Sequence, residues 1–241
     1  MILIRQEDIL HKFQLLKLLT KIVDNPLLSQ NLYFKGGTCA AMAGFLDRFS
    51  VDLDFDLKDI RAKSVIGDEL KKVFKDLDFI IENDKEKTLF FVLKYESPRN
   101  QRNTLKLSVY ENMVKSNEYK AIFLTEIDRL VNCQTIETMF ANKLVAPIDR
   151  YQKYKKIASR DIYDIHYFFS QGYKFKKEII NERTGLNSKE YIKLLIKFID
   201  ERITENILNE DLSTLLPYDK FKKVRKILKQ EVLIFLRSID S

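Results

Sequence analysis

The sequence lacks the features that mark membrane, secreted and disordered proteins. No apolar run reaches the roughly 18 residues that a membrane-spanning helix needs, so we expect no membrane partner. Only four prolines, together with 45% apolar and 32% charged residues, favour a folded chain with a real core. The first residues already include Glu7 and Asp8 and show no signal-peptide pattern, so we expect a cytoplasmic protein.

Cysteine and histidine are scarce, at two residues each. Cys39 and Cys133 give no disulfide framework, and both thiols are expected to be reduced in the cytosol. Together with the distant His11 and His166 they do not have the spacing of a zinc site. The chain also has no Gly-x-x-x-x-Gly-Lys-Ser/Thr loop and no Gly-x-Gly-x-x-Gly motif, which excludes the two common phosphate-binding fingerprints.

The most informative pattern present is an alternation of aspartate and apolar residues, Asp52-Leu-Asp54-Phe-Asp56. Because side chains alternate along a strand, the three aspartates share one face and the apolar residues share the other. Carboxylates roughly 7 Å apart repel unless a cation lies between them, and Mg²⁺ prefers carboxylate and phosphate oxygens. The pattern indicates a metal site, although alternating aspartates taken alone are more often a solvated strand face.

A glycine turn shortly before this strand strengthens the metal hypothesis. Gly36 and Gly37 follow a short expected strand, and their backbone leaves room for a ligand. Thr38 is a good N-cap for a small apolar helix over residues 39–46. Since a helix N-terminus attracts phosphate, the turn and the acidic strand together predict a site for a metal-bound phosphate compound.

The turn and the strand resemble the Gly-Gly-Thr, short helix and Asp-x-Asp signature of the DNA polymerase β-like nucleotidyltransferase superfamily. The fuller string over residues 35–56, with Arg48 and Ser50 before the aspartates, is similar to the AbiEii/AbiGii toxin family of nucleotidyltransferases. A second block over residues 137–164 resembles that family's downstream Lys-Leu-x-Ala and Arg-Asp-x-x-Asp motifs, which begin here at Lys143 and Arg160.

The resemblance implies an enzyme that transfers a nucleotide from a nucleoside triphosphate (NTP) and releases pyrophosphate. By that resemblance Asp52 and Asp54 are catalytic and bind Mg²⁺ or Mn²⁺, and Lys143 and Asp161 are further catalytic residues. The NTP phosphates would be bound by Gly36, Gly37 and Thr38. Arg48 and Ser50 would either bind the phosphates as well or hold the turn, and the resemblance does not separate these two roles. The resemblance also implies a toxin of a toxin–antitoxin or phage-defence system, with the tRNA 3′ end as acceptor and a cognate antitoxin as partner.

One position departs from the superfamily pattern. Related enzymes often carry a third carboxylate on a later strand, and the corresponding strand here spans residues 104–110. Ser108 lies where that acid would be. Asp56 and Asp161 are both candidates to replace it, and the sequence does not decide between them.

Positive charge is concentrated in the second half of the chain. The formal net charge is +7, of which residues 1–130 supply +1 and residues 131–241 supply +6. A basic face fits a polyanion such as RNA, whereas lysines that merely solvate helices are the plainer explanation. Aromatic residues that could stack on bases, but that at helical spacing more often belong to a core, are Tyr151, Tyr154, Tyr163, Tyr167 and Tyr173.

The periodicity predicts an α/β (α+β) fold in two domains. Residues 1–130 are expected to form a nucleotidyltransferase-type domain with a mixed sheet, and residues 131–241 a helical domain that completes the active site. In the first domain we expect helices over 5–24 and 59–77 and later strands over 79–81, 88–95, 104–110 and 121–125. In the second we expect helices over 135–146, 150–170, 191–203 and 219–237, with Pro147 breaking or kinking the first.

Two alternatives stay open. The acceptor could instead be a hydroxyl of a protein or small molecule, which the basic second half disfavours for a small neutral acceptor. The missing acid at Ser108 would also allow a non-catalytic regulator that binds a nucleotide or RNA without turning it over.

Overall fold

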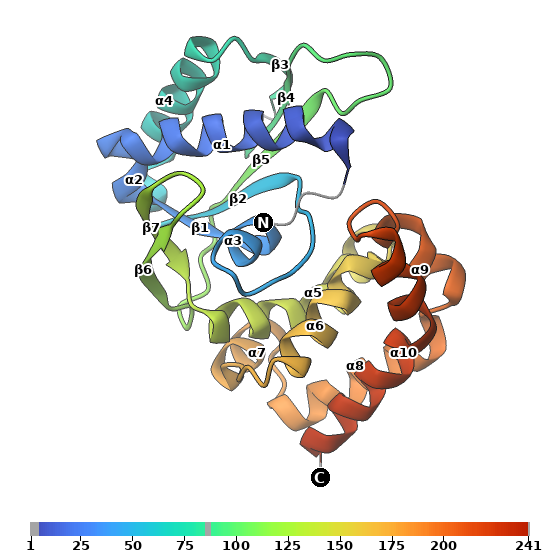
Figure 1. Ribbon diagram of the computed structural model, residues 1–241. Coiled ribbons are helices and arrows are strands. Elements are labelled where there is room, and N and C mark those ends of the chain that lie inside the picture. The colour runs from blue at the N-terminus through green and yellow to red at the C-terminus, as the bar shows by residue number, and fades with distance from the viewer. Residues whose placement is uncertain (1–4, 85–87, 241) are drawn as a thin grey trace. The chain divides into compact units, whose positions relative to one another are not determined.

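A computed structural model describes residues 5–84 and 88–240 of the chain (Figure 1). Residues 1–4, which precede the expected helix over 5–24, residues 85–87, between the expected strands over 79–81 and 88–95, and residue 241 lie outside the described residues. The chain divides into two compact units. The first comprises the residues up to 113 together with 118–134, and the second comprises 114–117 and the residues from 135 onward.

The first unit is built on one mixed sheet, as the sequence predicts. The strands in the described residues are β1 (Leu32–Lys35), β2 (Asp52–Leu57), β3 (Ile80–Asp84), β4 (Leu89–Lys94), β5 (Thr104–Tyr110), β6 (Tyr119–Leu124) and β7 (Arg129–Gln134). They lie in the order β3-β4-β5-β2-β1-β7-β6. The pairs β2–β5 and β1–β7 are parallel, and the other neighbours are antiparallel.

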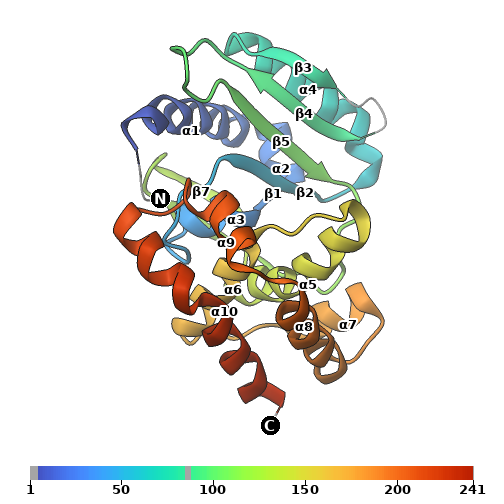
Figure 2. The same cartoon turned by 90° about the vertical axis from the view of Figure 1, so that its right-hand side faces the viewer.

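Helices bury the apolar side of this sheet. They are α1 (Ile9–Asp24), α2 (Pro26–Asn31), α3 (Gly36–Met42) and α4 (Lys63–Asp76), with short 3-10 turns η1 (Gln6–Asp8) and η2 (Ile60–Ala62). Figure 2 shows α4 alongside β3 and β4, and Phe74 of α4 meets Phe91 of β4 with ring centroids 5.0 Å apart. Cys39 and Cys133 are both free and buried in this unit, and burial raises the pKa of the Cys39 thiol. Cys39 therefore serves the core.

The second unit is helical, which confirms the predicted class of the C-terminal part. Its helices are α5 (Ile136–Tyr154), α6 (Ser159–Ser170), α7 (Lys177–Thr184), α8 (Ser188–Arg202), α9 (Glu205–Leu212) and α10 (Tyr218–Asp240). In this unit α6 packs against α5, α9 and α10 (Figure 1). None of the described helices combines the length and the apolar character needed to cross a bilayer.

Several local predictions were wrong. The helix expected to end at residue 146 continues to Tyr154, so Pro147 does not break it; whether the proline kinks the helix stays a prediction. The proline is buried, and packing of the helix outweighs the backbone hydrogen bond that it cannot donate. The expected helix over 150–170 is instead the end of α5 and a separate α6, because Lys155 takes a left-handed conformation that ends α5. Residues 177–184, 205–212 and 129–134 were given no secondary structure and form α7, α9 and β7.

Candidate active site

Asp52 and Asp54 lie on the same face of β2, and both side chains are half-buried. Leu53 and Phe55 point the other way and are buried in the core, as the alternation predicts. The strand therefore fixes the spacing of the two carboxylates through its own packing, since a slip of one residue would place the aspartates in the core.

The neighbouring strand β5 places Ser108 beside Asp54. The two strands are parallel, and their register pairs Asp52 with Lys106 and Asp54 with Ser108. The site-facing side of β5 thus offers an ammonium group and a hydroxyl where the superfamily pattern calls for a carboxylate. On the other side of β2, Lys35 of β1 is in register with Asp54.

Gly36 forms the turn next to this strand, and two observations explain why glycine stands there. Its φ is +79°, a left-handed conformation that favours glycine. A Cβ at Gly36 would also lie 2.7 Å from Oδ2 of Asp54. The Asp54 carboxylate is therefore held directly against the backbone at the N-terminus of α3.

Arg48 and Ser50 lie beneath the second glycine of the turn. A Cβ at Gly37 would be 2.7 Å from Nη2 of Arg48 and 3.1 Å from Oγ of Ser50. Arg48 is only 2% exposed, and its Nη1 donates to the carbonyl oxygen of Phe49 at 2.9 Å. The guanidinium thus supports the turn from inside the protein.

Thr38 connects the turn to the acidic strand. Its hydroxyl donates to the carbonyl oxygen of Asp52, and its Oγ1 is 2.8 Å from Oγ of Ser50. The prediction that Thr38 is an N-cap was wrong, because α3 begins at Gly36 and Thr38 lies in its first turn. The threonine instead ties the first turn of the helix to β2.

Asp56 differs from the other two aspartates of β2. It is 1% exposed and accepts hydrogen bonds from Nζ of Lys35 (2.7 Å), the Tyr119 hydroxyl (2.8 Å) and Nε2 of Gln134 (2.7 Å). The ammonium of Lys35 also lies 3.8 Å from the centre of the Tyr110 ring. Asp56 is thereby committed to joining β1, β6 and β7, and it orients Lys35 beside the turn.

The residues present fit a divalent cation bound together with a phosphate compound. Mg²⁺ is typically held by one or two carboxylates plus substrate phosphate oxygens, and Asp52 and Asp54 are two such carboxylates on one face. Across residues 5–84 and 88–240 no group of three or more His, Cys, Asp or Glu side chains forms a ready-made metal site. The substrate would therefore have to supply the remaining oxygen ligands.

The second family-like block forms a buried ionic cluster within the helical unit. Nζ of Lys143 on α5 lies 2.9 Å from Oδ1 of Asp161 and 2.8 Å from Oδ2 of Asp164, both on α6. Nε of Arg150 donates to the other oxygen of Asp161 at 3.0 Å. Both aspartates are buried, whereas the Lys143 side chain keeps 17% of its surface exposed.

The charges in this cluster control the protonation of Asp161. Burial alone would raise the pKa of its carboxyl group, but the nearby cations Lys143 and Arg150 outweigh burial and hold the pKa well below the usual 3.8. The carboxylate is therefore ionised at neutral pH and acts as a fixed partner for Lys143.

The structure brings most of the sequence-predicted residues into two local groups. In the first unit, the turn (Gly36, Gly37 and Thr38), its supports (Arg48 and Ser50) and the strand aspartates (Asp52 and Asp54) lie together. In the helical unit, Lys143 and Asp161 are paired. Sequence reasoning missed the partners of Asp56, because Tyr119 and Gln134 belong to strands far along the chain; only Lys35, directly before the glycines, had a visible signal.

Comparison with known proteins adds to this geometry. The sequence matches the family model described as "Nucleotidyl transferase AbiEii toxin, Type IV TA system" over residues 17–224. No curated protein matches the sequence.

Three solved structures share the fold. The crystal structure of JHP933 from Helicobacter pylori has a TM-score of 0.66 and 21% identity, with 99% of this chain and 94% of that chain covered. A putative nucleotidyltransferase from H. pylori has a TM-score of 0.61 and 20% identity, with 99% and 100% covered. MenT4, a nucleotidyltransferase toxin from Mycobacterium tuberculosis, has a TM-score of 0.60 and 16% identity, with 97% and 86% covered.

Proposed function

The chain belongs to the AbiEii family of nucleotidyltransferase toxins of type IV toxin–antitoxin systems, and we propose that it transfers a nucleotide from a Mg²⁺-bound NTP to RNA, at the 3′ end of tRNA. Membership of a toxin family also supports a cognate antitoxin as its partner. The transfer would release pyrophosphate.

The observation that carries this proposal is the contact between the glycine turn and the acidic strand. The Asp54 carboxylate lies against the backbone of Gly36, where the first turn of α3 begins. A phosphate oxygen bound at that turn would be next to the carboxylates that hold the cation. Asp52 and Asp54 are therefore suited to binding the cation of a metal–triphosphate complex, and the backbone at Gly36 is suited to binding its phosphates.

The reaction requires that an acceptor hydroxyl oxygen form a bond to the α-phosphorus while the bond from that phosphorus to the bridging oxygen of pyrophosphate breaks. Asp52 and Asp54 would hold the cation, which when bound neutralises charge on the phosphates and polarises the α-phosphoryl group. Backbone N–H groups at Gly36 and Gly37 would orient the phosphates. Arg48, Ser50 and Thr38 would keep the turn rigid, and positioning of this kind supplies a large part of such catalysis.

The Lys143 cluster is proposed to serve the same reaction. Lys143 would balance part of the triphosphate charge through the exposed part of its side chain, and Asp161 and Asp164 would hold its ammonium group in place. Asp161 is thus proposed as a positioning residue, since both of its oxygens accept from cations within the helical unit.

RNA is favoured as the acceptor by the charge of the chain. The residues from 131 onward carry +6 of the total charge of +7, and an RNA backbone is the commonest polyanion that such an excess would attract. A protein or small-molecule hydroxyl would not need this charge.

One observation supports a second candidate function, in which the protein binds a nucleotide or RNA without turnover. Ser108 stands beside Asp54 on β5, and Asp56 is already committed to three donors, so neither of these two positions supplies a third carboxylate. A general base from the protein would then be absent, and the acceptor hydroxyl would have to lose its proton to water.

A labelling experiment tests the proposal. The purified protein is incubated with Mg²⁺, total RNA and each α-³²P-labelled NTP in turn, beside an Asp52→Ala/Asp54→Ala variant of equal thermal stability. We expect label in a tRNA-sized band with one NTP, and none with the variant.

Other outcomes point elsewhere. Label on protein rather than RNA would mean a protein acceptor. An absence of label, with the NTP still bound in an equilibrium assay, would support the non-catalytic candidate. Label that persists in the variant would refute the assigned metal site.

A further inference from the structure

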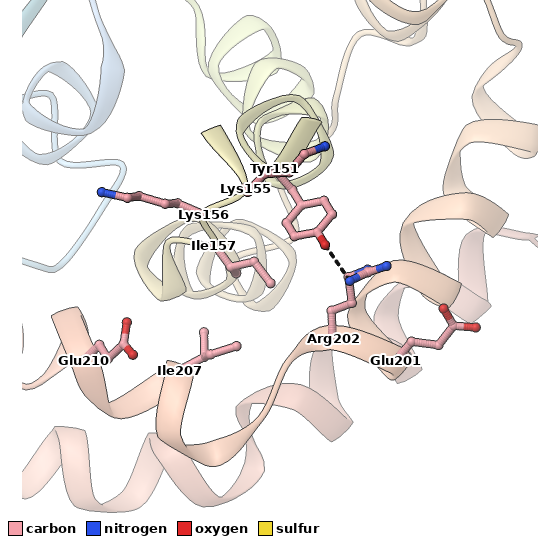
Figure 3. A pocket seen from close by; sticks show the side chains of 8 residues that line it. All are labelled: Tyr151, Lys155, Lys156, Ile157, Glu201, Arg202, Ile207 and Glu210. Atoms are coloured by element: carbon pink, nitrogen blue, oxygen red, sulfur yellow. Dashed lines mark hydrogen bonds between the residues drawn. The ribbon is translucent and has the colours of Figure 1, made fainter. Parts of the chain in front are cut away.

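The helical unit contains a cavity that the proposed catalytic residues do not use. It has a volume of about 660 Å³, within the roughly 300–1,000 Å³ typical of sites for small ligands. It lies between the end of α5, the end of α8 and α9 (Figure 3). The lining residues are Tyr151, Lys155, Lys156, Ile157, Glu201, Arg202, Ile207 and Glu210.

An aromatic ring and a guanidinium group are in contact at one end of this cavity. Arg202 donates from Nη1 to the Tyr151 hydroxyl at 2.7 Å, and its guanidinium carbon lies 4.5 Å from the centre of the ring. Edge-to-face contact with Phe198, at 5.5 Å between ring centroids, fixes the ring from another side. Aromatic rings and guanidinium planes are the surfaces on which proteins stack unpaired bases.

The cavity is lined by three cations, Lys155, Lys156 and Arg202, and by two carboxylates, Glu201 and Glu210, so its net charge is +1. Among the described residues, the salt bridges include none for Lys155, Lys156 or Arg202, and Glu201 is instead 3.9 Å from Lys197. Figure 3 shows Glu201 directed away from Tyr151, whereas Lys155 lies beside the ring. The ammonium of Lys155 is 5.5 Å from the ring centre. Positive charge and a stacking surface are therefore available at the same place.

The backbone at Lys155 gives an independent indication that its side chain matters. Lys155 has a φ of +54° at the C-terminal cap of α5, a position that usually takes glycine because a side chain is strained there. The matching cap of α7 is Gly185, with a φ of +72°. A residue other than glycine in this conformation can mark a functional position, and here that residue is a lysine that lines the cavity.

We infer that this cavity binds an unpaired nucleotide of the RNA acceptor, with the base against Tyr151 and Arg202 and the backbone phosphates at Lys155 and Lys156. The apolar side chains of Ile157 and Ile207 between the two ends would contact the base or ribose. This inference rests on the proposed function, because it names where the acceptor is held. A free NTP also carries a base and phosphates, so the test must separate binding of an RNA nucleotide from binding of a free NTP.

The first test uses a variant that removes charge and relieves strain together. Lys155→Gly deletes the ammonium group and puts the favoured residue at the left-handed position, so the melting temperature should be unchanged or higher. Lys189→Ala makes the same change of charge at the exposed start of α8, a helix that has Arg202 at its other end. The probe is a fluorescein-labelled single-stranded hexaribonucleotide, measured by anisotropy in EDTA without NTP.

We expect Lys155→Gly to weaken binding of this probe about tenfold and to lower the slope of log Kd against log salt by about 0.7, the value for one contact to single-stranded RNA. Arg202→Gln, which removes the stacking plane, should weaken binding by roughly five- to a hundredfold. Lys189→Ala should bind as the unchanged protein does.

Equal binding by the unchanged protein, Lys155→Gly and Arg202→Gln would overturn the inference, as would an equal loss in Lys189→Ala. Weaker binding of a labelled NTP with Mg²⁺, but not of the RNA, would assign the cavity to free nucleotide and also overturn it. The RNA arm needs neither Asp52 nor turnover, so its failure is distinct from failure of the proposed catalytic function.

Discussion

Two pairs of aspartates in this chain look alike in sequence but differ in their surroundings. Asp52 and Asp54 are half-buried on a strand face, beside a glycine turn. Asp161 and Asp164 are fully buried on a helix and share the ammonium of Lys143, with Arg150 on the first of them. Both pairs lie in blocks that resemble motifs of the same family, and their spacing in the sequence did not separate their roles.

The comparison indicates that the role of a carboxylate depends on where its neutralising cation comes from, either a side chain of the protein or the solution. The helix pair is neutralised by side chains of the protein itself, so it contributes to structure and positioning. The strand pair is half-buried on one face of β2, at a spacing that suits a divalent cation, so we propose it as the pair that holds a cation from solution. Removing one charge from the strand pair should therefore mainly lower turnover. Removing one charge from the helix pair should mainly lower stability.

The largest expected effect is on turnover, from Asp52→Asn. Removing one of the two proposed carboxylate ligands should lower nucleotide incorporation about a thousandfold or more, because a bound metal supplies several kcal/mol of charge stabilisation. The free energy of unfolding should change by less than about 1 kcal/mol, as for other partly exposed sites. Incorporation of label and urea denaturation measure the two quantities.

Asp76→Asn is the control for this prediction, because Asp76 is exposed at the end of α4 in the same unit. It should leave both quantities unchanged. A loss of stability in Asp52→Asn that accounts for its loss of activity would remove the distinction between the two pairs.

The next largest effect is on stability, from Asp161→Asn. This change leaves Lys143 and Arg150, which are both partly exposed, without one of their partners, so it should cost less than the roughly 3–5 kcal/mol typical of breaking a fully buried ion pair. For a chain of this size we expect the melting temperature of the helical unit to fall by less than roughly 10 °C. Calorimetry of the two aspartate variants side by side checks this, and equal melting temperatures would contradict the assignment of Asp161 to a buried ion pair.

A smaller effect should appear in the pH dependence of stability. The folded protein holds the pKa of Asp161 below 3.8, while unfolding returns it to about 3.9. Because the folded pKa is the lower one, the carboxylate stabilises the fold above about pH 4, and this contribution is lost as the pH falls below 4. The stability difference between the unchanged protein and Asp161→Asn should therefore shrink from pH 7 to pH 3, as measured by urea denaturation. A difference that stays constant would show that the ionised form is not favoured by folding.

Much of the first unit could be predicted from the sequence because its signals are local. The alternation from Asp52 to Asp56 identified β2 and its two faces, and the glycine pair identified the turn before α3. The sequence could not show that Asp56, unlike Asp52 and Asp54, is buried and bonded to three donors of the protein. Its partners Tyr119 and Gln134 lie 63 and 78 residues further along the chain, and only the strand order brings them to it.

The helical unit was harder to predict for two physical reasons. Pro147 is a strong local signal for a helix end, but the packing of α5 overrides it. Lys155 is a poor local signal, since lysine is a good helix former that here takes the left-handed conformation and ends the helix. The cavity beside Lys155 depends on the end of α5, so nothing in the sequence indicated the role proposed for Arg202 and Lys156.

The last comparison is between Gly36, the first residue of α3, and Gly44, which follows the end of that helix. Gly36 and Gly44 both have a φ of +79°, but a Cβ at Gly44 meets nothing within 4 Å, whereas one at Gly36 would lie 2.7 Å from Oδ2 of Asp54. Gly44→Ala should cost only the backbone strain, about 1 kcal/mol, with activity retained. Gly36→Ala should cost about 1–3 kcal/mol more from overpacking.

Gly36→Ala should also lower incorporation about a hundredfold, because a carboxylate displaced by about 1 Å is misplaced for the reaction. Urea denaturation and the labelling assay on the two variants separate strain from displacement, since strain is common to both. Equal activity in the two alanine variants would mean that the contact between the turn and Asp54 does not position the carboxylate. The proposed role of Asp52 and Asp54 would then depend only on their spacing along β2.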